Sequence, residues 1–161
     1  MSDEATSVIK RASALGLTIA TCESLTGGGV GAALTGVAGA SAVYLGGFIT
    51  YASAQKTAMV GVDVGHIAAH GVINATTAKQ MATGALERTG ADLAVSTTGV
   101  AGPSGQDGHE PGEVWIGLAW REDGNVTTAA TRHQCRGDRA DVRAGAVHAA
   151  IMTLLSHVGA A

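Results

Sequence analysis

A serine between a β-like run and a glycine-rich run is the first side chain of this 161-residue sequence that could do chemistry. The stretch "TCESLTGGGVG" (21–31) places Ser24 where a strand is expected to end and a helix to begin. Unpaired backbone N–H groups at a helix start favour a developing negative charge, so the position suits a nucleophile beside an oxyanion site. The alternative is that Ser24 and Thr26 only cap the helix.

The glycines of this stretch do not match the common nucleotide-binding loops. No Gly-Lys pair occurs in the sequence, which excludes a Walker loop. Leu34 stands where a dinucleotide fingerprint needs a third glycine or alanine. This leaves Ser24 as a candidate nucleophile, and a serine nucleophile needs a base from elsewhere in the chain.

A candidate base lies in the stretch "TYASAQK" (50–56), which contains Tyr51 and Lys56 in apolar surroundings. Burial disfavours the ammonium and lowers the pKa of a lysine, so Lys56 could take a proton from Ser24 near neutral pH. The alternative for Lys56 is a surface lysine on an amphipathic helix.

Three other patterns are weaker candidates. Ser53 and Lys56 match the S-x-x-K pattern of penicillin-recognising enzymes, but the companion S-D-N and K-T-G motifs are absent, so Ser53 is interpreted as a helix cap. Cys22 is a rival nucleophile, expected instead to be a small buried side chain within the strand. The six histidines are scattered, and no glutamate follows His66 in the His66 and His70 pair, so no metal site is expected.

Four of the seven arginines lie within "RHQCRGDRADVR" (132–143). Their guanidinium groups could clamp a phosphate or a carboxylate, because the planar fork binds such groups bidentately. The alternative is a solvated helix start in which Asp138 and Asp141 pair with the arginines. Different arginines of this cluster could take different roles.

Hydrophobic periodicity and turn residues divide the rest of the chain into helices and strands that must position these side chains. Helices are expected at 3–15, 27–36, 53–59, 74–89 and 138–157, and strands at 17–21, 43–52, 92–99, 113–121 and 125–134. The last two strands, joined by Glu122 to Gly124, read as a β-hairpin. This order predicts an α/β fold, a three-layer α/β/α sandwich with a mixed β-sheet, in a single domain over residues 1–161.

Composition and charge narrow the class of protein. Charged residues make up only 14% of the chain, against about 25% in typical domains, so a homo-oligomer, a dimer or higher, is expected. A net charge of −3 without a general basic surface argues against nucleic acid as a partner. The polar N-terminus and the lack of an unbroken apolar run of about 20 residues predict a cytoplasmic protein that does not bind membranes.

Six motifs along the chain resemble, in the same order, those of the CinA C-terminal domain family. They are "ESLTGG" (23–28), "GGFITYASAQK" (46–56), "HGVI" (70–73), "TGVAGPSG" (98–105), "VWIGLA" (114–119) and "GDRADVR" (137–143). The family includes nicotinamide-nucleotide amidases and has a three-layer α/β/α fold. The resemblance implies hydrolysis of the carboxamide of nicotinamide mononucleotide, which gives nicotinate mononucleotide and ammonia in pyridine-nucleotide salvage.

The resemblance also implies roles for residues. The family's E-S-x-T-G-G and T-Y-x-x-x-x-K motifs make Ser24, Tyr51 and Lys56 catalytic, with Ser24 as nucleophile and Tyr51 as relay or partner of Lys56. Arg139 of the G-D-R motif is expected to bind the substrate's phosphate. Substrate-binding positions are further expected at Thr26, Gly27, Gly28, Gly99, Ala101 and Gly102, with the N–H groups around Gly27 and Gly28 holding the oxyanion. No cofactor is expected.

Two further functions remain open beside this one. The loop "GQDGHEPGEV" (105–114) departs from the glycine-rich, lysine-containing loop common in the family, so a serine amidase acting on another small amide is an alternative. A non-catalytic module that binds a nucleotide or a protein is the other. The presence of Ser24, Tyr51 and Lys56 together favours an enzyme.

Overall fold

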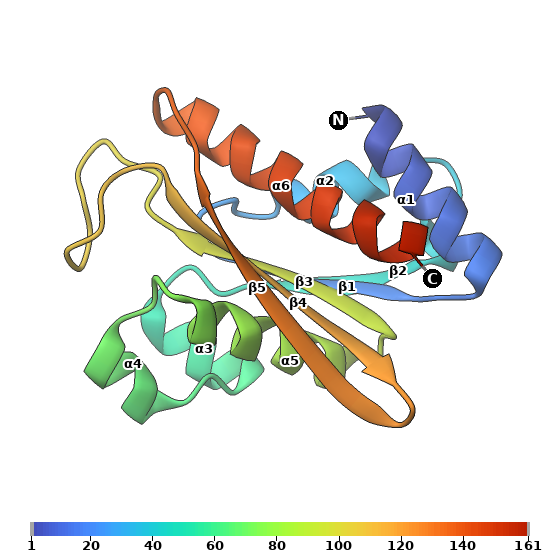
Figure 1. The fold of residues 1–161 in the computed structure, drawn as a ribbon, viewed down its shortest axis with the longest axis horizontal. Coiled ribbons are helices and arrows are strands. Elements are labelled where there is room, and N and C mark those ends of the chain that lie inside the picture. Colours follow the sequence, from blue (N-terminus) through green and yellow to red (C-terminus); the bar gives the residue numbers. More distant parts are fainter. Residues whose placement is uncertain (1, 161) are drawn as a thin grey trace.

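The apolar runs of the chain form the middle of a five-stranded β-sheet in the structure, a computed structural model that describes residues 2–160 (Figure 1). The strand order is β2-β1-β3-β4-β5. β1 (Ile19–Glu23) is fully buried and pairs in parallel with β2 (Tyr44–Ile49) and β3 (Leu93–Gly99). β4 (Glu113–Glu122) and β5 (Asn125–Gln134) continue the sheet as an antiparallel hairpin.

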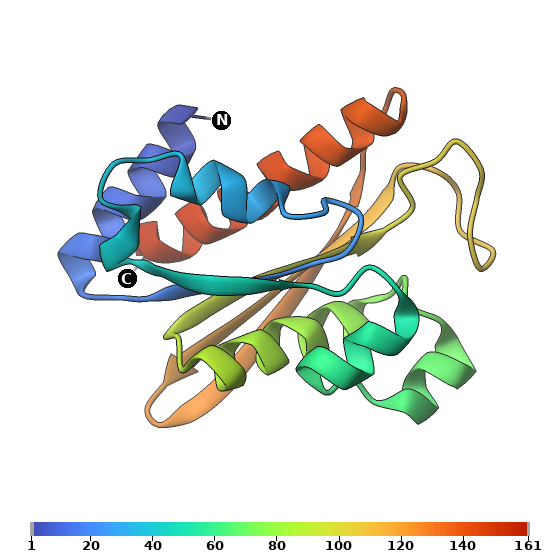
Figure 2. The same cartoon turned by 180° about the vertical axis from the view of Figure 1, so that it is seen from behind.

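Helices cover both faces of this sheet, which gives three layers (Figures 1 and 2). One face carries α1 (Ser2–Leu15), α2 (Gly29–Thr35) and α6 (Arg139–Ala160), and a short 3-10 helix (Ala40–Ala42) precedes β2. The other face carries α3 (Ser53–Val60), α4 (Val64–His70) and α5 (Ala75–Thr89). Two apolar cores fill the spaces between the sheet and these two helical layers.

Glycines let α5 approach its neighbours closely. A Cβ at Gly84 would overlap the backbone carbonyl of Val60, the last residue of α3. A Cβ at Gly117 of β4 would likewise overlap the Ala78 carbonyl of α5. The sheet, α5 and α3 therefore stack without intervening side chains at these points.

The topology brings three strand ends to one edge of the sheet. β1, β2 and β3 are parallel, so their carboxyl ends, Glu23, Ile49 and Gly99, lie at the same edge. The chain leaves β1 through α2 on one face and enters β3 from α5 on the other face. In open α/β sheets a crevice for ligands lies at such a switch point.

The structure confirms the predicted α/β fold with a mixed sheet, and the order of the expected elements. The hairpin turn has two residues, Asp123 and Gly124, and not the expected three, because Glu122 already pairs with Asn125. Both turn residues have positive φ, and such a two-residue turn matches the twist of the strands. Asn74 caps α5 as expected, accepting from the Thr77 N–H.

Two sequence-based expectations about helices were wrong. Helix α4 was not anticipated, because it has only seven residues and none of them is buried. Ser53 is not the cap of α3: the N-cap is Ala52, without a side-chain hydrogen bond, and Ser53 is already the first helical residue. Between residues 2 and 160, no helix has both the length and the apolar character needed to span a bilayer.

Candidate active site

Ser24 is the first residue after β1 and is held at the carboxyl edge of the sheet. Its N–H donates to the Thr97 carbonyl of β3 at 3.0 Å, which continues the ladder between the two strands by one residue. The side chain is 8% exposed. The sheet therefore fixes the backbone of Ser24, while the Ser24 hydroxyl stays accessible from the cavity.

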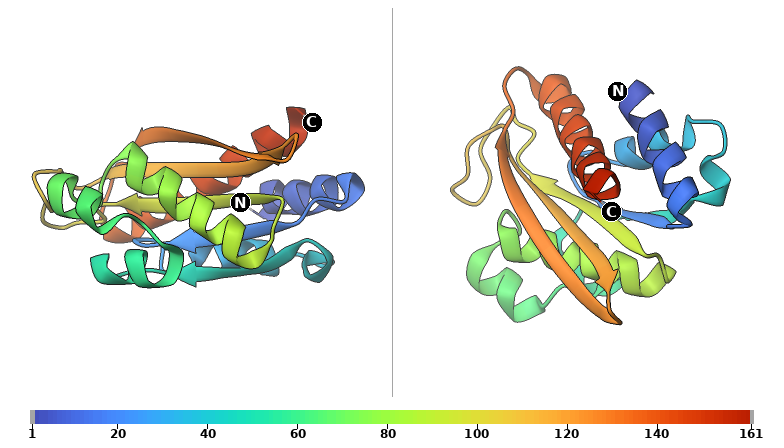
Figure 3. Two further views of the ribbon diagram at one scale, coloured as in Figure 1. Left: turned by 90° about the horizontal axis from the view of Figure 1, so that it is seen from below. Right: turned by 45° about the vertical axis from the view of Figure 1, so that its right-hand side comes forward.

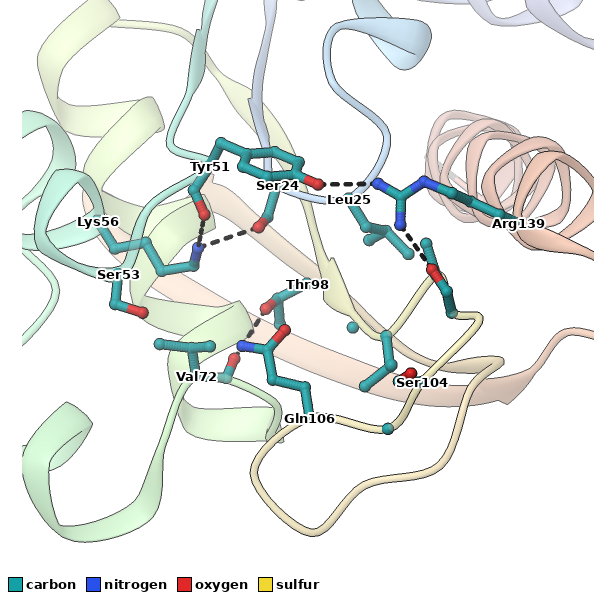
Figure 4. A pocket seen from close by; sticks show the side chains of 15 residues that line it. Ser24, Leu25, Tyr51, Ser53, Lys56, Val72, Thr98, Ser104, Gln106 and Arg139 are labelled. Carbon is teal, nitrogen blue, oxygen red and sulfur yellow. Dashed lines mark hydrogen bonds between the residues drawn. The ribbon is translucent and has the colours of Figure 1, made fainter.

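Lys56 reaches Ser24 from the first turn of α3. Its Nζ lies 3.0 Å from Ser24 Oγ and donates to the Thr50 carbonyl at 2.7 Å, with the Tyr51 carbonyl 3.5 Å away (Figure 4). A neutral amine has two N–H groups and one lone pair. If the two carbonyls accept the N–H groups, the lone pair faces the Ser24 hydroxyl, which is the arrangement a general base needs.

The environment of Lys56 shifts its protonation equilibrium toward the neutral amine. The side chain is only 1% exposed, and this burial lowers its pKa to about 8, an effect that the nearby Cys22 opposes slightly. Burial raises the pKa of the Cys22 thiol to about 11, so Cys22 stays protonated at neutral pH. Cys22 lies within buried β1, as expected, whereas Ser24 lies at the cavity beside Lys56.

Glu23 occupies the helix start that was expected to bind an oxyanion or a ligand. Its carboxylate is 2% exposed and accepts from the N–H groups of Gly28, Val30 and Gly31 at the beginning of α2. The Thr26 hydroxyl donates to the same carboxylate at 2.7 Å. An acidic side chain from the strand thus satisfies the free donors of this helix, and neither Ser24 nor Thr26 caps it.

This finding corrects the expected roles of three residues. The Gly27 N–H donates to the Ser24 carbonyl and the Gly28 N–H to Glu23, so neither is free to hold an oxyanion. Thr26 is buried against Glu23 and Thr97. None of the three lines the cavity beside Ser24. The glycines serve the tight turn instead, since Gly27 and Gly28 have φ of 61° and 97°.

A cavity of about 260 Å³ opens beside Ser24 and Lys56 (Figure 4). Gly99, Ala101 and Gly102 form part of its wall, as predicted. Sequence reasoning missed other lining residues because nothing local distinguishes them. They are Leu25, Ser53, Val72, Thr98, Ser104, Gly105 and Gln106.

Tyr51 and Arg139 face each other across the mouth of this cavity (Figure 4). Arg139 Nη2 donates to the Tyr51 hydroxyl at 2.9 Å, and its Nη1 donates to the Gly102 carbonyl at 2.7 Å. The Tyr51 side chain is 60% exposed. The phenol is thus directed toward Arg139 and not toward Ser24 or Lys56, so this geometry does not support the expected relay. Of the Tyr51 groups, the backbone carbonyl and not the phenol lies near Lys56 Nζ.

The arginine cluster of residues 132–143 divides into separate roles. Arg132 pairs with Glu113 at 2.9 Å, and this bond, with help from His109, holds the pKa of the Glu113 carboxyl at about 2. Arg139 faces the cavity. Arg143 donates to the carbonyls of Leu25 and Thr26, in the turn after Ser24.

Among residues 2–160, no three His, Cys, Asp or Glu side chains gather as a metal centre would require. The pairing of His66 and His70 that the sequence raised is a ring contact at 5.0 Å within α4. The reactive side chains that the structure brings together at the cavity are the buried Lys56 and the adjacent Ser24.

Residues 2–158 match the model of a protein family described as the CinA C-terminal domain. Two solved bacterial structures have this fold over nearly the whole chain. A CinA superfamily protein of Klebsiella pneumoniae is 32% identical, with a TM-score of 0.88 over 99% of this chain and 98% of that one. A competence/damage inducible protein of Agrobacterium tumefaciens is 36% identical, with a TM-score of 0.88 over 96% and 93%.

Curated relatives are longer than this chain. A CinA-like protein of Chlorobaculum tepidum is 47% identical over 125 residues, which cover 76% of this chain and 30% of that protein. The chain spans about a third of the length of such relatives. None of these names states a reaction.

Proposed function

The chain belongs to the CinA C-terminal domain family, and from that premise we propose that it is a serine amidohydrolase. Its proposed substrate is nicotinamide mononucleotide, and its products are nicotinate mononucleotide and ammonia. The observation that carries this proposal is the buried Lys56 amine 3.0 Å from the Ser24 hydroxyl. Burial lowers the pKa of Lys56 to about 8, so above that pH the amine is mostly neutral and can accept a proton, a property that a binding module does not require.

In the proposed acylation, Ser24 Oγ attacks the carboxamide carbon while Lys56 takes the hydroxyl proton. The C–N bond then breaks, and Lys56 returns the proton to the departing ammonia. Water then attacks the acyl-enzyme with Lys56 again as base, the C–O bond to Ser24 breaks, and Lys56 returns the proton to Ser24 Oγ; the carboxylic acid that is released ionises to the carboxylate. Each proton has an acceptor within the site, so the scheme needs no metal and no cofactor.

Arg139 is proposed to bind the substrate's phosphate. Its guanidinium stands at the cavity mouth, and the contacts with Gly102 and Tyr51 fix its plane. Arginine pairs with phosphate through several directed donors, so a fixed plane also fixes the ligand's orientation. Tyr51 is proposed to act through Arg139 and as part of the wall, beside the carbonyl that orients Lys56.

The test is ammonia release from nicotinamide mononucleotide by the purified protein, beside Ser24→Ala and Lys56→Met. We expect turnover by the wild type and a loss of at least about 100-fold in each variant, since each removes a group that acts directly on the reacting atoms. Unchanged thermal unfolding of both variants is the control. Turnover that survives in Ser24→Ala would contradict the proposal.

A second substrate class is favoured by the wall opposite the dyad. Ser104 and Gln106 come from the loop after β3 and face the same cavity as Ser24 (Figure 4). An amide with more hydrogen-bonding groups than a nicotinamide ring would use them. Activity on other small amides but not on nicotinamide mononucleotide would support this alternative, and nucleotide binding without turnover of any amide would support a non-catalytic module.

We also propose that copies of the chain associate through the β2 edge of the sheet. No charged residue lies between Glu23 and Lys56, and this stretch forms α2, the 3-10 helix and β2. Leu45, Ile49 and Tyr51 are exposed there. An apolar edge strand without charges pairs readily with another strand, and a second copy offers the same uncharged surface.

A further inference from the structure

The turn that follows Ser24 is held from two sides by charged groups. On the inner side, the Glu23 carboxylate takes the N–H groups of Gly28, Val30 and Gly31. On the other side, Arg143 of α6 donates from Nε to the Leu25 carbonyl and from Nη2 to the Thr26 carbonyl, each at 3.0 Å. Arg143 does not line the cavity.

Among residues 2–160, the N–H groups of Leu25 and Thr26 in this turn have no acceptor, and of these two residues Leu25 lines the cavity. The Gly27 N–H donates to the Ser24 carbonyl at 3.0 Å, so that carbonyl points into the turn. The peptide bond is planar and trans, so the Leu25 N–H points the opposite way.

We propose that the Leu25 N–H is the oxyanion donor of this site and that Arg143 is the positioning residue that keeps it in place. This inference rests on the proposed serine chemistry. The two contacts of Arg143 fix two successive peptide planes, which restricts the backbone on the C-terminal side of Leu25. The Ser24 contact with Gly27 restricts it on the other side.

The two contacts need the guanidinium group, since its Nε and Nη2 donate to two neighbouring carbonyls at once. Arginine offers several donors in a planar fork, whereas a lysine ammonium is one point charge that cannot hold two carbonyls in the same geometry. Because Arg143 does not line the cavity, it should affect the transition state and leave ground-state binding unchanged. Arg139, one helical turn earlier on α6, has the converse role of holding the ligand.

The test uses an alkyl fluorophosphonate, which reacts with activated serines. Ser24 Oγ forms a bond to phosphorus, the P–F bond breaks, fluoride leaves, and Lys56 accepts the serine proton. The phosphoryl oxygen takes the place of the substrate's oxyanion. The rate of mass gain by the intact protein therefore reports nucleophile and oxyanion donor together, without requiring that the natural amide be known.

The variants are Arg143→Lys and Arg143→Ala, with Arg136→Ala as the matched control. Arg136 belongs to the same cluster, is exposed, and makes no hydrogen bond or ion pair with the described residues. We expect labelling to slow by at least about tenfold in both Arg143 variants, because loss of an oxyanion donor costs about 10² to 10³ in rate. Arg136→Ala should label at the wild-type rate.

Two further measurements separate positioning from simple support of the fold. Guanidinium ions at a few millimolar should restore part of the labelling rate of Arg143→Ala and should not affect Arg136→Ala. With nicotinamide mononucleotide, Arg143→Lys should lower kcat by the same factor as labelling and leave KM within about twofold.

Each outcome decides the matter. Wild-type labelling by Arg143→Lys, or a raised KM with unchanged kcat, would overturn the inference. If Arg143→Ala does not fold, Arg143→Lys decides, since it keeps the charge and the aliphatic stem. Labelling of the wild type at Ser24 without any ammonia release would refute the proposed substrate and leave this inference testable, whereas no labelling at Ser24 would overturn both.

Discussion

At the scale of single residues, the protonation state of Lys56 decides whether this side chain can act as the proposed base. Burial lowers its pKa to about 8, so below that pH most of the protein has an ammonium that cannot accept the Ser24 proton. We therefore predict that kcat/KM for amide hydrolysis rises about tenfold per pH unit between pH 6 and 7.5 and levels off above about pH 8.5.

The measurement is a pH profile of initial rates between pH 6 and 9.5 in buffers of constant ionic strength. Lys56→Arg is the matched variant, because a guanidinium stays protonated across this range and should give no activity at any pH. A profile that is flat or falls from pH 6 to 8 would show that Lys56 is not the base.

The hydroxyl of Tyr51 offers a second residue-scale prediction. It accepts a hydrogen bond from Arg139 and lies away from the dyad, so Tyr51→Phe should raise KM several-fold and keep kcat within about threefold. Steady-state kinetics with nicotinamide mononucleotide separate these constants. A fall of kcat by 100-fold or more, as loss of an acid–base group would cause, would restore the relay suggested by the family resemblance.

At the scale of elements, the contact between α3 and α5 holds Lys56 against Ser24. Gly84 lies directly under the Val60 carbonyl at the end of α3. We predict that Gly84→Ala destabilises the protein by about 1 to 3 kcal/mol, as overpacking typically does, and lowers kcat because α3 must move.

Thermal unfolding and turnover of Gly84→Ala measure both effects. Gly65→Ala is the control, since Gly65 lies in exposed α4 without a positive φ and its Cβ would meet a single side-chain atom, Oδ1 of the exposed capping residue Asp63 at 3.2 Å, and no backbone atom. That variant should unfold at the wild-type temperature or slightly above it. Equal effects of the two substitutions would contradict the role given to the α3 and α5 contact.

At the scale of the whole molecule, the sheet has two unlike edges (Figure 3). The β2 edge carries no charge and exposes Leu45 and Ile49, whereas the β5 edge follows the charged turn Glu122 to Gly124. We predict that the protein is a dimer or a higher oligomer at micromolar concentration, and that Leu45→Lys combined with Ile49→Lys gives a folded monomer.

Light scattering during size-exclusion chromatography gives the mass of each species. Val126→Lys places a lysine on the exposed β5 edge and should leave the mass unchanged. A monomeric wild type, or dissociation by Val126→Lys as well, would contradict association through β2.

The sequence determined the elements and pointed to the two candidate residues of the site, because each depends on local information. Short apolar runs rich in β-branched residues and bounded by turn residues favour strands, and longer stripes at helical spacing favour helices, so the strands and the main helices were predicted to within a few residues. Ser24 and Lys56 were predicted because a hydroxyl after a strand and a lysine in apolar surroundings are chemically distinctive. Helix α4 was missed because a short, exposed helix has no such pattern.

Only the tertiary structure decided how the groups around the dyad are used. Arg139 meets Tyr51 across 88 positions of sequence, and Arg143 meets Leu25 across 118, so no local pattern pairs them. Glu23 accepts from the helix N–H groups that were expected to bind the substrate. A buried carboxyl group must be hydrogen-bonded, and the donors at the start of α2 are within its reach. Which donors remain for a ligand depends on which of them the fold has already used.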